Sequence, residues 1–292
     1  MRQARVRVVG YLSIDTLQVE GTVSQRVPGG AALYAALGAR LAGGDVSVEA
    51  SVGDDYPPQW LPALDALGID VSRVQQRTGL TRRATLRHHG DGRRTSSHFR
   101  DALWWERTRE LAPVTAHDLS HTDIVVACPM PIDTLSSLMA RAADAGVPVV
   151  ADTSEAFVSG DPRWMMELIG RLAIFAPSRE ETRQLLPKHD DDAAATCLAG
   201  RGVHILQKRG AQGAMAIAAH AVQGTCIPAP PAAVVDPTGA GDATVGALAT
   251  HWSSDRDFLA AAQAALAIGA LATTGTGPAG LGLVIDSPTQ LP

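Results

Sequence analysis

The sequence predicts an α/β fold in which helices flank both faces of a mostly parallel central sheet, with a few antiparallel strands at one edge or mouth of that sheet. From about residue 120 onward, short β-branched runs alternate with amphipathic runs rich in Ala and Leu, the pattern of strands joined by crossover helices. Earlier in the chain, Gly90-Asp91-Gly92 separates two alternating runs, which is a hairpin signal. Near the C-terminus, a glycine-rich turn precedes a helical pattern.

The individual elements follow from the same patterns, taken in chain order. The first part of the chain predicts strands at residues 6–9 and 46–52, a helix at 31–41, and hairpin arms at 84–89 and 95–99. The remainder predicts strands at 123–127, 147–151, 172–175 and 203–207, with helices at 132–145 and from about 179. A second hairpin is expected at 213–217 and 221–227, a strand-like run at 226–235, and two helices at 240–251 and 255–273.

Composition narrows the class of protein. The chain has 292 residues, 46% hydrophobic and 19% charged, which is ordinary for a globular protein. The chain has 25 Lys and Arg and 30 Asp and Glu, with no cluster of basic residues, so nucleic acid is not an expected partner. Three widely spaced cysteines argue against a disulfide framework. No apolar run suits a membrane span or a cleaved leader, so we expect a cytoplasmic protein without a membrane partner.

The glycine-rich turn, VVDPTGAGDATVG at residues 234–246, is the most informative segment of the chain. Pro237 ends any strand, and the helical pattern resumes after Asp242, so the turn lies at a helix N-terminus. Unpaired N–H groups and the positive end of the helix dipole make such a turn an anion site. Asp242 beside it either caps the helix or acts as a general base next to bound phosphate, and the Asp-Pro-Thr prefix favours the second interpretation.

Residues 236–243, DPTGAGDA, resemble the signature of the ribokinase (PfkB) family of carbohydrate kinases. The resemblance implies a ribokinase-like three-layer fold and ATP-dependent phosphoryl transfer to a hydroxyl group. It also implies that Asp242 is the catalytic base and that the amides of Gly239, Ala240 and Gly241 form the anion hole.

Two N-terminal motifs extend the resemblance. Residues 10–15, GYLSID, resemble the family's first strand, which implies that Asp15 binds substrate hydroxyls. The Gly29-Gly30 pair resembles the glycines that let backbone approach the sugar, and Tyr34 stands where the family often has a substrate-contacting Asn.

The spacing of these motifs implies a small lid, formed by segments at about 11–28 and 84–100 of a single domain spanning 1–292. Because extensive lid strands often form the dimer contact in this family, the resemblance leaves both a monomer and a homodimer open.

The family's Asn-x-x-Glu motif is represented by SREE at residues 178–181. The resemblance places Ser178 near the nucleotide and Glu181 near Mg²⁺, which it would orient through water. Without the resemblance, the acids of this segment would be read as first-turn residues that favour a helix dipole. Ser in place of Asn is a departure from the family pattern.

Residues 206–214, LQKRGAQGA, resemble the family segment near the nucleotide phosphates, which implies nucleotide-binding roles for Lys208, Gly210 and Gly213. A solvated lysine is the alternative for Lys208.

Three further positions are assigned by the resemblance. Thr238 is expected beside the nucleotide, and Gly277 lies in the region that borders its base. Asp236 matches a loop that carries a monovalent cation in some members, so potassium activation is a hypothesis. The GTGPAG segment at 275–280 lacks the preceding strand that a dinucleotide fingerprint needs.

Together these motifs predict a kinase that uses ATP and Mg²⁺ to phosphorylate a sugar, a polyol or a related small molecule. The short lid and the Ser-x-x-Glu variant resemble the inositol-kinase-like branch. A nucleoside kinase of the same family is the first alternative; with aromatic residues only 4% of the chain, a slot for a base depends on Trp104, Trp105 and Tyr34. A catalytically idle, ligand-binding family member is the second.

Overall fold

A computed structural model describes residues 2–19, 25–88, 94–96, 102–113, 118–158 and 162–285. Within them, a central sheet has the strand order β13-β12-β11-β10-β9-β8-β1-β4-β5. All neighbouring strands from β11 to β5 are parallel, and β12 and β13 extend the sheet antiparallel at one edge. Its strands are β1 (Arg5–Val9), β4 (Asp45–Gly53), β5 (Ile69–Arg77), β8 (Ile124–Ala127), β9 (Val149–Ala151), β10 (Ile174–Phe175), β11 (His204–Lys208), β12 (Ala214–Ile217) and β13 (Thr225–Ile227).

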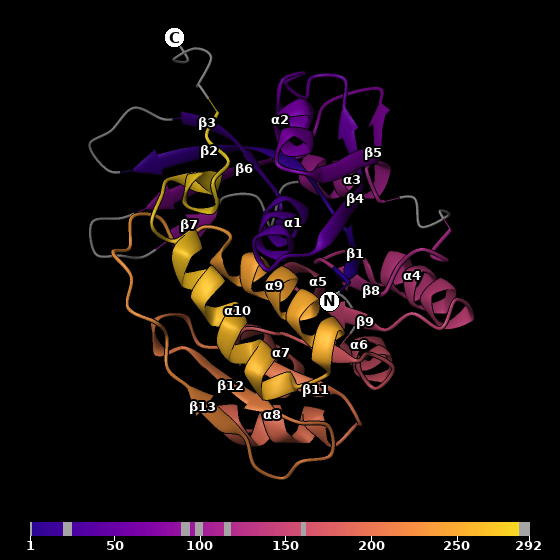
Figure 1. Cartoon of the computed structure of the whole chain (residues 1–292), viewed down its shortest axis with the longest axis vertical. Coiled ribbons are helices and arrows are strands. Elements are labelled where there is room, and N and C mark those ends of the chain that lie inside the picture. The colour runs from indigo at the N-terminus through magenta and orange to yellow at the C-terminus, as the bar shows by residue number, and fades with distance from the viewer. Residues whose placement is uncertain are drawn as a thin grey trace.

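Helices cover both faces of this sheet, which confirms the predicted three-layer α/β fold (Figure 1). Successive strand residues point to opposite faces, so Val8 enters one hydrophobic core and Val9 the other. One face carries α1 (Ala31–Leu41), α2 (Trp60–Ala66), α9 (Ala240–Asp255) and α10 (Phe258–Ala272). The other carries α3 (Ala102–Glu110), α4 (Ile132–Asp144), α5 (Glu155–Val158), α6 (Pro162–Ile169), α7 (Arg179–Leu185) and α8 (Asp191–Ala199). In the part of the chain that the structure describes, no helix combines the length and apolar character needed to cross a bilayer.

A second sheet, called the small sheet below, has the order β3-β2-β6-β7. It forms where the chain leaves the carboxyl ends of β1 and β5, so it stands at that edge of the central sheet (Figure 1). The antiparallel pairing of β6 with β7 confirms the first predicted hairpin, whose turn lies outside the described residues. Its strands are β2 (Ser13–Val19), β3 (Gln25–Gly29), β6 (Arg83–His88) and β7 (Arg94–Ser96).

The segment before α9 differs from the prediction. The strand-like run expected at 226–235 is wrong, because β13 ends at Ile227 and no strand follows it up to α9. Pro228, Pro230 and Pro231 have no N–H group to donate to a ladder, which explains why pairing stops there. The result is an irregular segment that borders the site described below.

Helices α1 and α9 touch through their backbones. A Cβ atom at Gly38 would lie 2.1 Å from the carbonyl oxygen of Ala243, and one at Gly246 would lie 1.9 Å from that of Ala35. Only glycine fits at either position. The contact brings the N-termini of both helices to the carboxyl edge of the central sheet, where α/β sheets usually bind their ligands.

Candidate active site

The turn that begins α9 is held by a buried carboxylate. Asp236 accepts a hydrogen bond from the Thr238 N–H at 2.9 Å and another from the Gly277 N–H at 2.8 Å. These two bonds fix the turn against the short 3₁₀ helix η2 (Gly277–Leu281). The side chain of Asp236 therefore fixes the conformation of the turn.

Unbonded donors are concentrated at this turn. Within the described residues, the N–H groups of Gly239 and Gly241 have no acceptor, and that of Ala240 donates over a long 3.4 Å to the Pro237 carbonyl. The hydroxyl oxygen of Thr238 is buried and likewise makes no hydrogen bond to a described residue. Donors left unpaired at a helix N-terminus fit an anionic ligand.

The Tyr34 side chain, from α1, packs against this turn. A Cβ atom at Gly239 would lie 2.1 Å from the Tyr34 ring, and Gly239 has a φ of +74°, a conformation that favours glycine. The ring is almost completely buried. Tyr34 therefore supports the backbone of the turn, in addition to lining the cavity where the sequence placed it.

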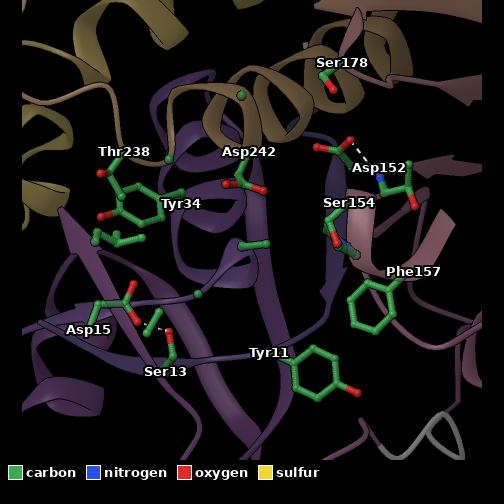
Figure 2. Close-up of a pocket in the computed structure, with 18 of the residues that line it drawn as sticks. Tyr11, Ser13, Asp15, Tyr34, Asp152, Ser154, Phe157, Ser178, Thr238 and Asp242 are labelled. Atoms are coloured by element: carbon green, nitrogen blue, oxygen red, sulfur yellow. Dashed lines mark hydrogen bonds between the residues drawn. The ribbon is translucent and has the colours of Figure 1, made fainter. Parts of the chain in front are cut away.

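Asp242 points into a cavity of about 520 Å³, here called the acceptor cavity (Figure 2). On one side lie Asp15 and Ser13, whose hydroxyl donates to the Asp15 carboxylate at 2.7 Å; on the other lie Tyr11 and Phe157. We call the part around Asp15 and Ser13 the polar end and the part around Tyr11 and Phe157 the aromatic end; Tyr34 also lies on the Asp15 side, and Ser154 lies beside Phe157 (Figure 2).

The Gly29-Gly30 pair connects the small sheet to α1. A Cβ atom at Gly29 would lie 2.0 Å from a carboxylate oxygen of Asp15, so this glycine makes room for that side chain. Gly30, with φ +96°, lines the acceptor cavity directly. The structure therefore brings Asp15, Gly30 and Asp242 to one cavity, as the sequence motifs imply. Gly29 packs against the Asp15 side chain and does not line the cavity.

A second cavity of about 540 Å³, here called the donor cavity, lies on the other side of the glycine turn. The two cavities share Lys208, Gly210, Pro237 and Gly241. The donor cavity is also lined by Gly213, Ala240 and apolar residues of α10 and of the segment after β13. Gly277 lines neither cavity; it packs instead near Leu17 and Val27 of the small sheet.

Lys208 lies where the cavities meet and forms a buried ion pair with Asp152. Burial lowers the pKa of Lys208, but the charges of Asp152, Glu181 and Asp242 outweigh it, so the pKa is raised and the lysine is charged. A cation at this point faces both cavities. The alternative of a solvated lysine is excluded.

Ser178 and Glu181 form a capping box at the start of α7. The Ser178 N–H donates to Glu181 at 2.6 Å, and the Glu181 N–H donates to the Ser178 hydroxyl at 3.2 Å. Burial raises the pKa of Glu181 to about 7, with Lys208 opposing the shift and Asp152 adding to it. In the described residues, no cluster of three or more His, Cys, Asp or Glu side chains could hold a metal ion. Two carboxylates beside a shared lysine fit an ion held mainly by water and phosphate oxygens.

Sequence reasoning missed several residues of this site. Asp152 directly follows buried strand β9, and a polar residue at the carboxyl end of a parallel strand could have identified it. Arg82, Tyr11 and Phe157 carry no such signal, because the aromatic end of the acceptor cavity is assembled from segments far apart in the chain.

Comparison with known proteins gives the family. The model of the pfkB family carbohydrate kinases matches residues 5–282. The chain is 28% identical over 252 residues to the cytidine kinase of Thermococcus kodakarensis, covering 85% of this chain and 88% of that protein.

Solved structures agree on the fold. The chain resembles a nucleoside kinase of Burkholderia thailandensis in complex with inosine, with a TM-score of 0.77, 21% identity, and coverage of 94% of this chain and 92% of that one. It also resembles an E. coli structure described as a ribokinase II, in complex with ATP and Mg²⁺, with a TM-score of 0.76, 21% identity and 94% coverage of both chains. With the family model spanning almost the whole sequence, the chain belongs to the pfkB family of carbohydrate kinases.

Proposed function

We propose that this kinase transfers the γ-phosphoryl group of ATP to a hydroxyl of a nucleoside. The observation that carries the proposal is the meeting of two cavities at the glycine turn, with Asp242 on the acceptor side and Lys208 shared between them. A donor and an acceptor bound in these cavities would face each other across unpaired N–H groups. Such preorganised donors stabilise the charge of a transferring phosphoryl group.

The reaction follows from this placement. The acceptor hydroxyl lies beside Asp242, which takes its proton as the oxygen attacks the γ-phosphorus. The new O–P bond forms while the bond from the γ-phosphorus to the β–γ bridging oxygen breaks, and ADP leaves with that electron pair. The amides of Gly239 and Gly241 and the ammonium of Lys208 stabilise the charge of the phosphoryl group.

Glu181 and Asp152 are the residues that would hold hydrated Mg²⁺ near the phosphates, where the ion neutralises phosphate charge. The E. coli ribokinase II structure in complex with ATP and Mg²⁺ supports the use of these two ligands. Asp236 and Thr238 keep their hypothetical role at a potassium site. Equal rates in potassium-containing and potassium-free buffer would remove that role.

The aromatic end of the acceptor cavity favours a nucleoside. The Arg82 guanidinium lies against the Tyr11 and Trp104 rings, which leaves Phe157 to pack against a flat base, whereas a polyol needs hydroxyl partners along its whole length. Asp15 and Gly30 at the polar end would then hold the ribose hydroxyls. The relatives that act on cytidine or bind inosine support the same class.

A free sugar or polyol is the second candidate acceptor. The hydrogen-bonded pair of Ser13 and Asp15 beside Gly30 favours it, because these groups can bind hydroxyls without any base. For either acceptor, we propose that the small sheet acts as the lid of a single kinase domain.

The test is coupled measurement of ADP release over a panel of nucleosides, free sugars and polyols. We expect nucleosides to be turned over, and Asp242→Asn to lower kcat by about 10²-fold or more, since it removes the general base. Asp255→Asn, at the exposed far end of the same helix, is the matched control and should be unchanged. Turnover of sugars alone would replace the nucleoside by the second candidate, and absence of turnover with every acceptor would leave a ligand-binding protein.

A further inference from the structure

Arg82 is a residue of the acceptor cavity that neither the catalytic chemistry nor the ribose end explains. It immediately precedes β6, and its carbonyl oxygen accepts a hydrogen bond from the Ile14 N–H at 2.9 Å. This bond fixes its backbone to β2 of the small sheet. Its side chain lines the acceptor cavity.

Two aromatic rings hold the guanidinium group. Its central carbon lies 4.1 Å from the centroid of the Tyr11 ring and 4.6 Å from that of the Trp104 ring. The Tyr11 hydroxyl donates to the Thr108 carbonyl at 2.7 Å, and Trp104 packs against Trp105 and Phe157. Both rings are therefore anchored, and the cation is held at the aromatic end of the cavity.

Among the described residues, no hydrogen-bond acceptor or ion-pair partner contacts this cation. The Arg82 side chain makes no hydrogen bond or ion pair with any residue that the structure describes, and its Nε atom is buried and unbonded. The next residue, Arg83, shows the contrast, because it forms an ion pair with Asp55. Burial lowers the pKa of Arg82 to about 10, with Tyr11 and Asp15 opposing the shift, so the side chain stays charged at neutral pH.

The Nε atom of Arg82 is buried without an acceptor, while the rest of the side chain is partly exposed to the cavity, where a ligand can supply acceptors to its N–H groups. Guanidinium presents its N–H donors as a rigid planar fork, which matches a carbonyl oxygen next to a second acceptor. Guanine and hypoxanthine offer such a pair in O6 and N7, and cytosine offers one in O2 and N3. Adenine has an amino group in place of the carbonyl.

We propose that Arg82 is a specificity-determining residue that binds the carbonyl edge of the acceptor's nucleobase, so that the kinase prefers carbonyl-bearing nucleosides to adenosine. This inference rests on the proposed function, since it requires a nucleoside in the acceptor cavity. Arg82 lies at the aromatic end, away from Asp242, and takes no part in proton or phosphoryl transfer.

The test compares kcat/KM for two groups of ribonucleosides. Inosine, guanosine and cytidine carry the carbonyl; adenosine and purine riboside do not. We expect the wild-type protein to prefer the carbonyl group by about 10- to 100-fold, the discrimination that a bidentate arginine contact typically gives. Arg82→Met should remove this preference by lowering kcat/KM for the carbonyl group only, leaving the other group within about twofold.

Two further variants sharpen the test. Arg82→Lys keeps the charge but not the planar fork, so it should lose most of the preference as well. Arg87→Met, at an exposed position of β6 where the Arg87 side chain donates a hydrogen bond to Gln18, should retain it. Thermal unfolding of each variant verifies that it is folded.

The outcomes separate this inference from the proposed function. Nucleoside turnover without a carbonyl preference, or an equal loss with both groups in Arg82→Met, would overturn the role of Arg82 alone. Turnover of sugars but of no nucleoside would overturn the nucleoside acceptor and the role of Arg82 together. A wild-type preference that Arg82→Met abolishes and Arg87→Met retains would establish the inference.

Discussion

Lys208 and Asp152 form a buried ion pair at the junction of the acceptor and donor cavities, with the Glu181 carboxyl near enough to interact with both. The pair joins the end of β11 to the end of β9, two strands that β10 separates in the sheet. One cation thus balances two buried acids at the point where phosphate is expected.

Replacing Lys208 by Met should destabilise the protein. The change leaves Asp152 and Glu181 buried without their cation, and breaking a buried pair in this way typically costs about 3–5 kcal/mol. Chemical denaturation at pH 7 without ligands measures the effect. The double variant Lys208→Met/Asp152→Asn should recover part of the loss, whereas Lys188→Met, at an exposed position, should have no effect. Unchanged stability in Lys208→Met would show that the pair contributes nothing to the fold.

The raised pKa of Glu181 predicts a pH dependence of stability. Because the folded-state pKa is about 7 and the ordinary value is 4.5, the native state retains a proton that the unfolded chain releases between these pH values. The stabilisation is complete below about pH 4.5 and is lost as the pH rises through about 7. One pKa unit corresponds to about 1.4 kcal/mol, so the loss is about 3 kcal/mol at most.

The measurement is the free energy of unfolding of the wild-type protein minus that of Glu181→Gln, across pH 4–8. This difference should fall with rising pH. The same measurement on Glu180→Gln, an exposed acid of the same helical turn, controls for the substitution itself. A difference for Glu181→Gln that does not change with pH would mean that the pKa of Glu181 is not raised.

The two glycines of the anion hole should respond differently to Ala. At Gly241 the atoms nearest to an added Cβ belong to the Lys208 side chain, at 3.5 Å, so Gly241→Ala should leave stability within about 0.5 kcal/mol and weaken nucleotide binding. At Gly239 it would collide with the Tyr34 ring in a left-handed backbone, so Gly239→Ala should lose both stability and activity. Denaturation and nucleotide titration of both variants provide the readouts. Tight nucleotide binding by Gly241→Ala would remove this turn from the donor site.

Gly246→Ala should separate α9 from α1. The added methyl group would lie 1.9 Å from the Ala35 carbonyl oxygen, and overpacking of this kind costs about 1–3 kcal/mol. Displacement of Asp242 by even 1 Å would also lower kcat, by about 10²-fold. Gly170→Ala, where the nearest atom is 3.5 Å away, is the control and should match the wild type in both assays. An active and stable Gly246→Ala protein would show that the helices can move apart freely.

Local chemistry made much of this fold and site predictable. The proline and glycines before Asp242 dictate a turn at a helix N-terminus, and alternating strand and helix patterns dictate a parallel sheet. Lys208 could be placed at a strand end, but its ion pair could not, because Asp152 lies 56 positions earlier in the chain. The surroundings of Arg82 were equally hidden. Arg82, Tyr11 and Trp104 meet only after the small sheet and α3 have assembled.

The wrong prediction, a strand at 226–235, has a local cause. Apolar and β-branched residues at both ends of the run suggested pairing, and the prolines inside it decided otherwise. Pro230 and Pro231, whose rings are apolar, instead line the donor cavity.

The direct backbone contact between α1 and α9 has a consequence for how such an enzyme can change. Gly30 begins one helix and the turn at Gly239 begins the other, so the proposed acceptor and phosphate sites belong to one closely packed unit. The strands of the small sheet lie outside that unit, in the segments that follow β1 and β5. Substitutions in the small sheet can change the proposed acceptor preference without changing the distance between the N-termini of α1 and α9. Natural variants can therefore acquire new specificities while the proposed phosphoryl-transfer geometry is kept.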